Sequence, residues 1–259
     1  MKKILFIVLF FALTGMVKAQ DDTTHRADKV AAIELKEEGI PAAKPKKVYN
    51  LSNRSNDHFM AQLGYTMWTG QPDSIQTKGF SRSVNFYFMF DFPFKATPQF
   101  SAAIGLGVGS DHIVFDKSYP NLKGQTTTLR FNRAPDTTYF KKTKLATTYL
   151  EAPIELRYIS NPERSEKSFK MALGVKVGTM IKAGVRGRQL MSNSGVKLND
   201  YQSKEASKRY FNTTRVVGTA RVGYGVISLF ATYQITKLLK DVAGPELRPF
   251  TVGLTLSGL

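Results

Sequence analysis

Residues 82–94 read Arg-Ser-Val-Asn-Phe-Tyr-Phe-Met-Phe-Asp-Phe-Pro-Phe, and a large apolar side chain stands at every second position from Val84 to Phe94. A period of two places these side chains on one face of an extended strand and the intervening residues on the other. The same alternation recurs in other segments of the 259-residue chain. The predicted strands are residues 58–69, 82–94, 99–114, 145–159, 169–186, 212–224, 226–235 and 248–258.

Alternation of this kind fits two closed architectures. A soluble lipocalin-type barrel turns its apolar face inward around a ligand, whereas an outer-membrane barrel turns that face to lipid and encloses polar groups. The second face here carries Gly, Ala and Ser together with Glu, Lys and Arg. Because the interior of an eight-stranded barrel is just wide enough to be filled by side chains, such small and ionic residues suit it. We therefore predict that Phe86, Phe88 and Phe90 face lipid.

The connections between the predicted strands alternate in length. Residues 95–98, 160–168 and Gly225 form short gaps, and outer-membrane barrels combine short periplasmic turns with long outside loops. The sequence therefore predicts an all-β protein, an eight-stranded antiparallel transmembrane β-barrel with a short, mostly irregular N-terminal segment and both termini in the periplasm. The long loops would be residues 70–81, 115–144, 187–211 and 236–247. The predicted periplasmic girdle of outward aromatics is Phe59, Phe94, Phe100, Tyr158, Phe169 and Tyr224.

The N-terminal region has the layout of an export signal. Met1-Lys2-Lys3 is positively charged, an apolar run follows to Met16, and Val17-Lys18-Ala19 suits cleavage before Gln20. The competing interpretation is a membrane anchor, but the run is shorter than the roughly 20 residues that span a bilayer. We predict a signal peptide at 1–19, a periplasmic tether at 20–57 and an outer-membrane barrel at 58–259.

Composition excludes several kinds of chemistry. The chain has no cysteine and three histidines, so it offers neither disulfides nor a thiolate or histidine-rich metal site. Its net charge of +17 includes basic runs at 141–144 and 204–209. Such runs can indicate nucleic acid, which an exported protein seldom meets. Solvated loop charge and contacts with lipopolysaccharide phosphates are the two remaining interpretations. We expect outer-membrane lipid and lipopolysaccharide as partners, and no cofactor, metal or nucleic acid.

Ionic residues on the inner face predict a packed lumen. Charges removed from bulk water must be paired, which favours a salt-bridged core over the alternative of a selective anion conduit. The register predicted across the short hairpin sets Glu151 opposite Lys176 and Arg157 opposite Lys170, and leaves Glu155 reaching diagonally toward Gly174 or its basic neighbours. The predicted structural ion pairs join Glu151 and Glu155 to Arg157, Lys176, Arg215 and Arg221.

Two motifs resemble functional sites, but each lacks a feature that such a site requires. The run from Gly105 to Gly109 lacks the G-x-G-x-x-G spacing of a phosphate loop and is expected to be lumen-side glycine on a strand. Ser110 and His112 share an outward face and could in principle cleave a lipid ester. Asp111 points to the other face, so no acid orients the histidine. We predict no catalytic residues and a non-enzymatic protein.

Two stretches carry a family resemblance. Residues 148–158, TYLEAPIELRY, followed by 169–178, FKMALGVKVG, resemble the central hairpin of PorT-like outer-membrane barrel proteins of the Bacteroidota. Residues 244–254, GPELRPFTVGL, resemble the final strand of the same group. The resemblance implies a structural or accessory role linked to type IX secretion, with secretion-machinery or other envelope proteins as partners. The alternatives are an adhesin-like barrel that binds through its long loops and a small ligand-carrying barrel.

Overall fold

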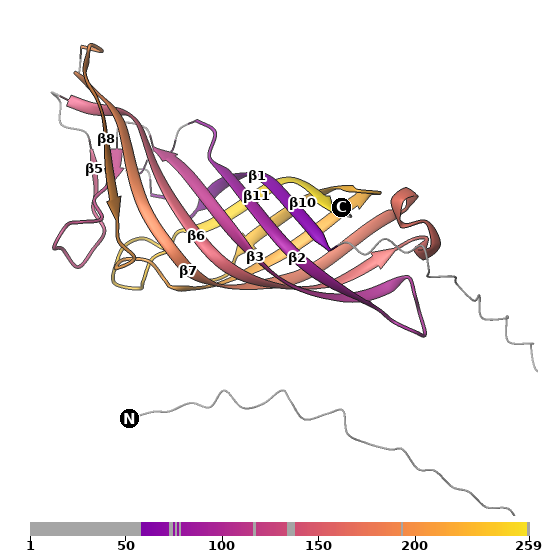
Figure 1. The fold of residues 1–259 in the computed structure, drawn as a ribbon. Coiled ribbons are helices and arrows are strands. Elements are labelled where there is room, and N and C mark those ends of the chain that lie inside the picture. The colour runs from indigo at the N-terminus through magenta and orange to yellow at the C-terminus, as the bar shows by residue number, and fades with distance from the viewer. Residues whose placement is uncertain are drawn as a thin grey trace, which may run out of the picture. The chain divides into compact units, whose positions relative to one another are not determined.

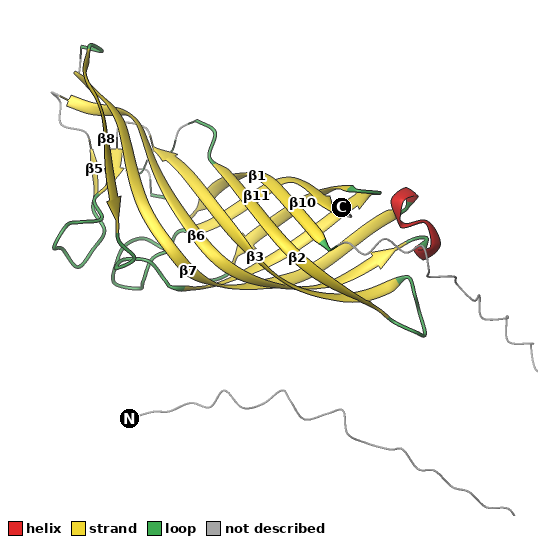
Figure 2. Ribbon diagram, in the orientation of Figure 1, coloured by secondary structure: helices red, strands yellow, loops and turns green. Residues whose placement is uncertain are grey.

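The computed structural model describes residues 58–257 apart from 73, 74, 76, 78, 116, 117, 134–137 and 193. The predicted signal peptide and tether therefore lie outside the described residues. Within them nearly all regular structure is strand, and the one helix is the short 3-10 helix η1 (Pro162–Lys167) (Figure 2). No helix in this part of the chain is long and apolar enough to cross a membrane.

Eight of the described strands form a closed ring. They pair antiparallel in the order β1, β2, β3, β6, β7, β9, β10, β11, and β11 pairs back onto β1 (Figure 1). Closure leaves the ring without an open edge. The predicted all-β, eight-stranded antiparallel barrel is confirmed. The strands are β1 (Phe59–Thr69), β2 (Arg82–Pro93), β3 (Phe100–Phe115), β4 (Ser118–Pro120), β5 (Phe131–Arg133), β6 (Thr138–Ile159), β7 (Phe169–Ser192), β8 (Lys197–Ala206), β9 (Thr214–Tyr224), β10 (Ile227–Gln234) and β11 (Arg248–Ser257).

The apolar face of the barrel points outward. Phe86 is 62% exposed and Phe90 49%, whereas Glu151 is 1% exposed and Lys176 3%. These outward side chains form an apolar band that continues across β3, β6 and β7. A ligand-carrying barrel requires the opposite arrangement, so that alternative is wrong. The band includes Leu63, Phe88, Ile104, Leu106, Val108, Leu150, Ile154, Leu156, Leu173 and Val175.

The two ends of the barrel differ. The short connections, including η1, lie at one end together with the last residues of β11 (Figure 2). We call this the short-turn end and the other the long-loop end. The predicted girdle residues are exposed near the short-turn end, apart from the partly buried Tyr158. Two of them pair directly across strands, with the Phe100 and Tyr158 ring centroids 5.1 Å apart.

The register predicted for the β6–β7 hairpin is wrong by two residues. Glu151 lies opposite Gly178, Arg157 opposite Ala172, and Lys170 opposite Ile159. The ladder closes where the Ser160 N–H donates to the Phe169 carbonyl oxygen at 3.0 Å, whereas the predicted register would set Tyr158 opposite Phe169. Ser168 lies in the turn, where its hydroxyl donates to the carbonyl oxygens of Asn161 at 2.8 Å and Arg164 at 2.5 Å, and β7 begins at Phe169 as predicted. Glu155 lies directly opposite Gly174 rather than diagonal to it.

Strands β6 and β7 extend well past the predicted limits of residues 145 and 186. The far part of β7 pairs with β8, a strand in the predicted 187–211 loop, and the three rise beside one another at the long-loop end (Figure 1). We call residues 138–147, 183–192 and 197–206 the arm. Its many charged residues obscure the alternation because neither face of the arm lines a polar lumen.

An apolar cluster occupies the inner side of the long-loop end. Inward positions change there from ionic to apolar, as at Ile113 and Leu145, and pack against side chains from the long loops. The Tyr210 hydroxyl holds one such loop by donating to the carbonyl oxygens of Gly124 at 2.5 Å and Thr126 at 3.0 Å. We call this cluster the apolar cap. Its members include Trp68, Ile75, Phe115, Leu122, Leu129, Val185, Tyr210, Phe211, Leu238, Leu239 and Leu247.

Candidate functional site: the ionic lumen

The strand register builds the lumen from alternating large residues and glycines. Tyr87, Gly107, Glu151, Gly178 and Arg215 form one row across five neighbouring strands. Neighbouring strands lie about 4.8 Å apart, so side chains on alternate strands start nearly 10 Å apart. Two such side chains can meet only if the residue on the strand between them has no side chain. The two glycines of this row provide that space.

Glu151 is the acceptor at the centre of the row. The Tyr87 hydroxyl donates to its Oε2 at 2.5 Å, and Arg215 Nε donates to its Oε1 at 2.5 Å. A Cβ built on Gly107 would lie 2.4 Å from Cδ1 of the Tyr87 ring, and one on Gly178 would lie 3.0 Å from Cγ of Glu151. The contacts of this carboxylate therefore depend on the glycines at both sides.

Arg215 joins this row to a second carboxylate. Its Nη1 lies 2.7 Å from Oδ2 of Asp111, and its guanidinium lies 3.8 Å from the centre of the Tyr149 ring. Two carboxylates and an aromatic face thus surround one buried guanidinium. A position that binds two carboxylates at once and stacks on a ring suits arginine and not lysine.

Lys176 completes this group, which we call the Glu151 cluster. Its Nζ donates to the Tyr87 hydroxyl at 3.1 Å and to Oε1 of Gln62 at 2.9 Å. Tyr87 therefore accepts from Lys176 and donates to Glu151. The phenol links the buried ammonium to the buried carboxylate. The cluster consists of Gln62, Tyr87, Asp111, Tyr149, Glu151, Lys176 and Arg215.

A second group, the Glu155 cluster, lies nearer the short-turn end. Glu155 Oε2 accepts from Arg157 Nε at 3.1 Å and from Arg221 Nη2 at 2.7 Å. Arg157 Nη1 lies 3.7 Å from Oδ1 of Asp91, and the Ser101 hydroxyl donates to that oxygen at 2.6 Å. All of these charged side chains are at most 6% exposed. Pairing offsets their desolvation, which would otherwise cost several kcal/mol per ion.

The six residues predicted for the lumen are all buried inside the barrel. Glu151 pairs with Arg215, and Glu155 pairs with Arg157 and Arg221. The prediction missed several partners that lie on the polar face of its own strands. The register between strands is the signal that would have found them. The missed residues are Gln62, Tyr87, Asp91, Asp111 and Tyr149.

A small cavity lies beside the Glu151 cluster. This cavity, lined by Asn85, Asp111, Lys176 and Arg215, has a volume of about 20 Å³, which is enough for about one water molecule. Among the described residues no group of three or more His, Asp or Glu side chains could hold a metal ion. The two ionic clusters fill the lumen with paired charges.

The outward Ser110 and His112 do form a contact. The Ser110 hydroxyl lies 3.3 Å from Nε2 of His112 and 3.3 Å from the Thr148 hydroxyl. Asp111, between them in the chain, faces the lumen and binds Arg215. The pair therefore has no acid from its own strand to orient the imidazole.

A closed antiparallel barrel with an apolar outer band and an ionic lumen is the architecture of a transmembrane barrel of the bacterial outer membrane. The chain matches the family described as outer membrane protein beta-barrel domain over residues 47–243, and it belongs to that family. Its location is accordingly the outer membrane. No curated protein was found to match the chain.

Proposed function

We propose that this protein is a non-conducting, non-enzymatic structural or accessory barrel of the outer membrane. The short-turn end and both termini lie in the periplasm, and the long loops and the arm lie outside. The observation that carries the proposal is the pairing of buried charges across the bore, centred on Glu151 and Glu155. An ion-conducting pore needs a continuous wet path, and two barriers lie on it.

The first barrier is the pair of ionic clusters, in which each carboxylate is already bound to arginine. The second is the apolar cap, where Trp68 and Phe115 pack with their ring centroids 5.6 Å apart. An ion would have to break buried salt bridges and then cross an apolar layer. Both steps are costly because neither offers the ion replacement for its water.

Single-channel recording tests this proposal. We expect the full mature chain, reconstituted in a planar lipid bilayer, to show no steady conductance across repeated insertions. A known open porin reconstituted in the same way serves as the positive control. Regular, reproducible current steps from the purified barrel would contradict the filled lumen and with it the proposed function.

The accessory part of the proposal is supported by the arm. Strand β8 pairs only with β7 among the described strands, so its other edge is open to backbone pairing. Beside the arm's turn, Val196 is 60% exposed and Leu198 52%. Exposed apolar side chains beside an open strand edge are typical of a protein-binding surface. Together with the PorT-like sequence stretches, this surface supports contact with secretion-machinery or other envelope proteins.

Affinity capture from native envelopes tests the accessory role. We expect the wild-type chain to retain type IX secretion components and the double variant Val196→Glu/Leu198→Glu to lose most of them. Val242→Glu is the matched control, because Val242 is 70% exposed in a different loop. Capture of no envelope protein, combined with loop-dependent binding of cells to a surface, would favour the adhesin-like alternative instead.

A further inference from the structure

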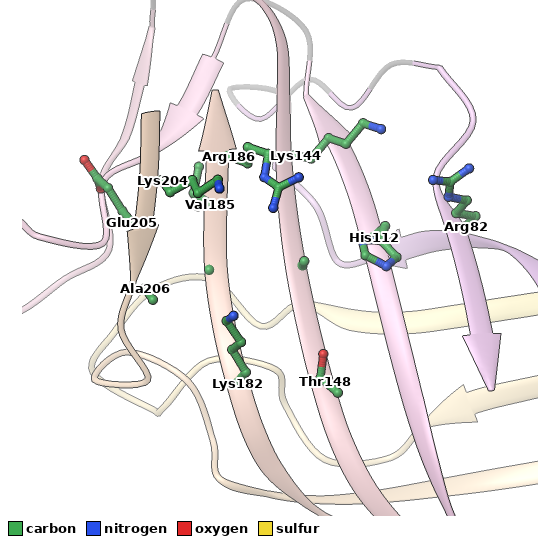
Figure 3. Close-up of a pocket in the computed structure, with 12 residues that line it drawn as sticks. Arg82, His112, Lys144, Thr148, Lys182, Val185, Arg186, Lys204, Glu205 and Ala206 are labelled. Atoms are coloured by element: carbon green, nitrogen blue, oxygen red, sulfur yellow. The ribbon is translucent and has the colours of Figure 1, made fainter. Parts of the chain in front are cut away.

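A groove on the outer wall of the barrel concentrates positive charge just above the apolar band. It has a volume of about 420 Å³, and five of its twelve lining residues are lysine or arginine (Figure 3). Its one carboxylate, Glu205, pairs in register with the inward-facing Val185, so it belongs to the other face of the arm. The five cations are Arg82, Lys144, Lys182, Arg186 and Lys204.

The register explains the shape of the groove. Ala146, Gly184 and Ala206 are directly opposite one another on β6, β7 and β8, so the floor has almost no side chains. The next row along the same strands consists of Lys144, Arg186 and Lys204, which are also direct neighbours. Arg82 and His112 pair at the β2–β3 end of the floor row. Figure 3 shows Lys182 on the opposite side of the floor row from Lys144 and Arg186.

Three cations side by side on adjacent strands repel one another. Like charges directly opposite in a sheet are destabilising. Among the described residues Arg82, Lys182 and Arg186 have no ion-pair partner. An arrangement that is unfavourable when empty becomes favourable when an anion enters it.

The position of the groove identifies the anion. Val108 and Leu150, 41% and 45% exposed, pair with each other in the last apolar row of β3 and β6. The first polar row, Ser110 and Thr148, follows two residues later, a rise of about 7 Å. Groups at this height in an outer membrane are the phosphates on the sugar headgroup of lipopolysaccharide when the long-loop end faces outward.

We propose that this groove binds a phosphorylated sugar headgroup of lipopolysaccharide in the outer leaflet. The Lys144–Arg186–Lys204 row and Lys182 neutralise the phosphate, and the small floor residues leave room for it. Thr148, on the groove wall, can donate a hydroxyl hydrogen bond. The inference rests on the proposed orientation, because the groove meets the outer leaflet only if the long loops face outside.

Native mass spectrometry of the full mature barrel in detergent tests the binding, with purified diphosphorylated lipid A as the probe. We expect Lys182→Gln/Arg186→Gln/Lys204→Gln to weaken retention of this lipid at least tenfold. The control Lys123→Gln/Arg209→Gln/Lys240→Gln removes the same charges from exposed sites elsewhere and should retain lipid like the wild type. Dephosphorylated lipid A should bind weakly to all three proteins.

A second variant separates binding from charge and from folding. Ala146→Trp fills the groove from an outward position without changing the net charge, and it should also weaken retention at least tenfold. The triple groove variant should unfold at equal or higher urea concentration than the wild type, because repulsion is removed. Equal retention by wild type and both groove variants, or equal binding of inorganic phosphate or phosphatidylglycerol at matched concentration, would overturn the proposal.

A labelling experiment distinguishes failure of the site from failure of the orientation. Because the chain has no cysteine, Lys208→Cys and Glu166→Cys each add a single thiol, one at each end of the barrel. An impermeant maleimide should label Lys208→Cys on intact cells and Glu166→Cys only after the outer membrane is opened. The reverse pattern would overturn both the orientation and the lipopolysaccharide assignment, whereas the conductance result would still stand.

Discussion

Replacing Arg215 by methionine is expected to lower the free energy of unfolding by about 3–5 kcal/mol, because it leaves buried charge without its partner. Arg215 binds Asp111 and Glu151 together, and these carboxylates are 9% and 0% exposed at their side chains. Without the guanidinium the two acids would repel each other in the lumen, away from bulk water. Urea unfolding of the barrel reconstituted in lipid vesicles measures the change.

Two further variants test whether charge is the cause. The triple variant Arg215→Met/Asp111→Asn/Glu151→Gln removes all three charges and should recover much of the lost stability. Arg209→Met removes a cation from an exposed loop position and should change stability by no more than about 0.5 kcal/mol. If Arg215→Met alone behaved like Arg209→Met, the ionic clusters would not be holding the barrel together.

Gly107→Leu is expected to prevent most of the chain from reaching the closed barrel. A Cβ at this position would lie 2.1 Å from the Phe86 carbonyl oxygen and 2.4 Å from the Tyr87 ring. Extra methylenes in a packed interior cost about 1–3 kcal/mol, and more where backbone must move. The side chain would also separate Tyr87 from Glu151, and a hydrogen bond to a charged group contributes about 1.5–3 kcal/mol.

Heat-modifiable migration on a gel measures the closed fraction directly, because an unheated closed barrel migrates differently from the unfolded chain. Gly218→Leu is the matched control on β9, since its Cβ would have only the Tyr233 carbonyl oxygen within 4 Å, at 3.9 Å. We expect Gly218→Leu to migrate as a closed barrel before heating. A Gly107→Leu variant that did the same would show that the row does not need glycine between Tyr87 and Glu151.

Sequence patterns do not predict the arm or the apolar cap. Strand β8 lies in a polar, charged stretch with weak alternation. The register of the β6–β7 ladder changes between Thr148 and Tyr149, before β7 reaches the part that pairs with β8. Near that point the neighbouring residues Ile181 and Lys182 are both exposed, so the alternation between the two faces of β7 is interrupted there. The cap gathers residues from four separate loops whose only shared feature is that they are apolar.

The alternation of apolar and polar residues along the strands was enough to derive the all-β ring, its lipid-facing side and the set of residues inside it. The reason is that a strand has only two faces and one of them here is uniformly apolar. Which inward residues meet was decided by closure of the ring. The β6–β7 register differs from the predicted one by two residues, and the rows formed by all the strands set Tyr87, Glu151 and Arg215 around glycines. Contacts between alternate strands depend on several registers at once, so no single segment of the chain specifies them.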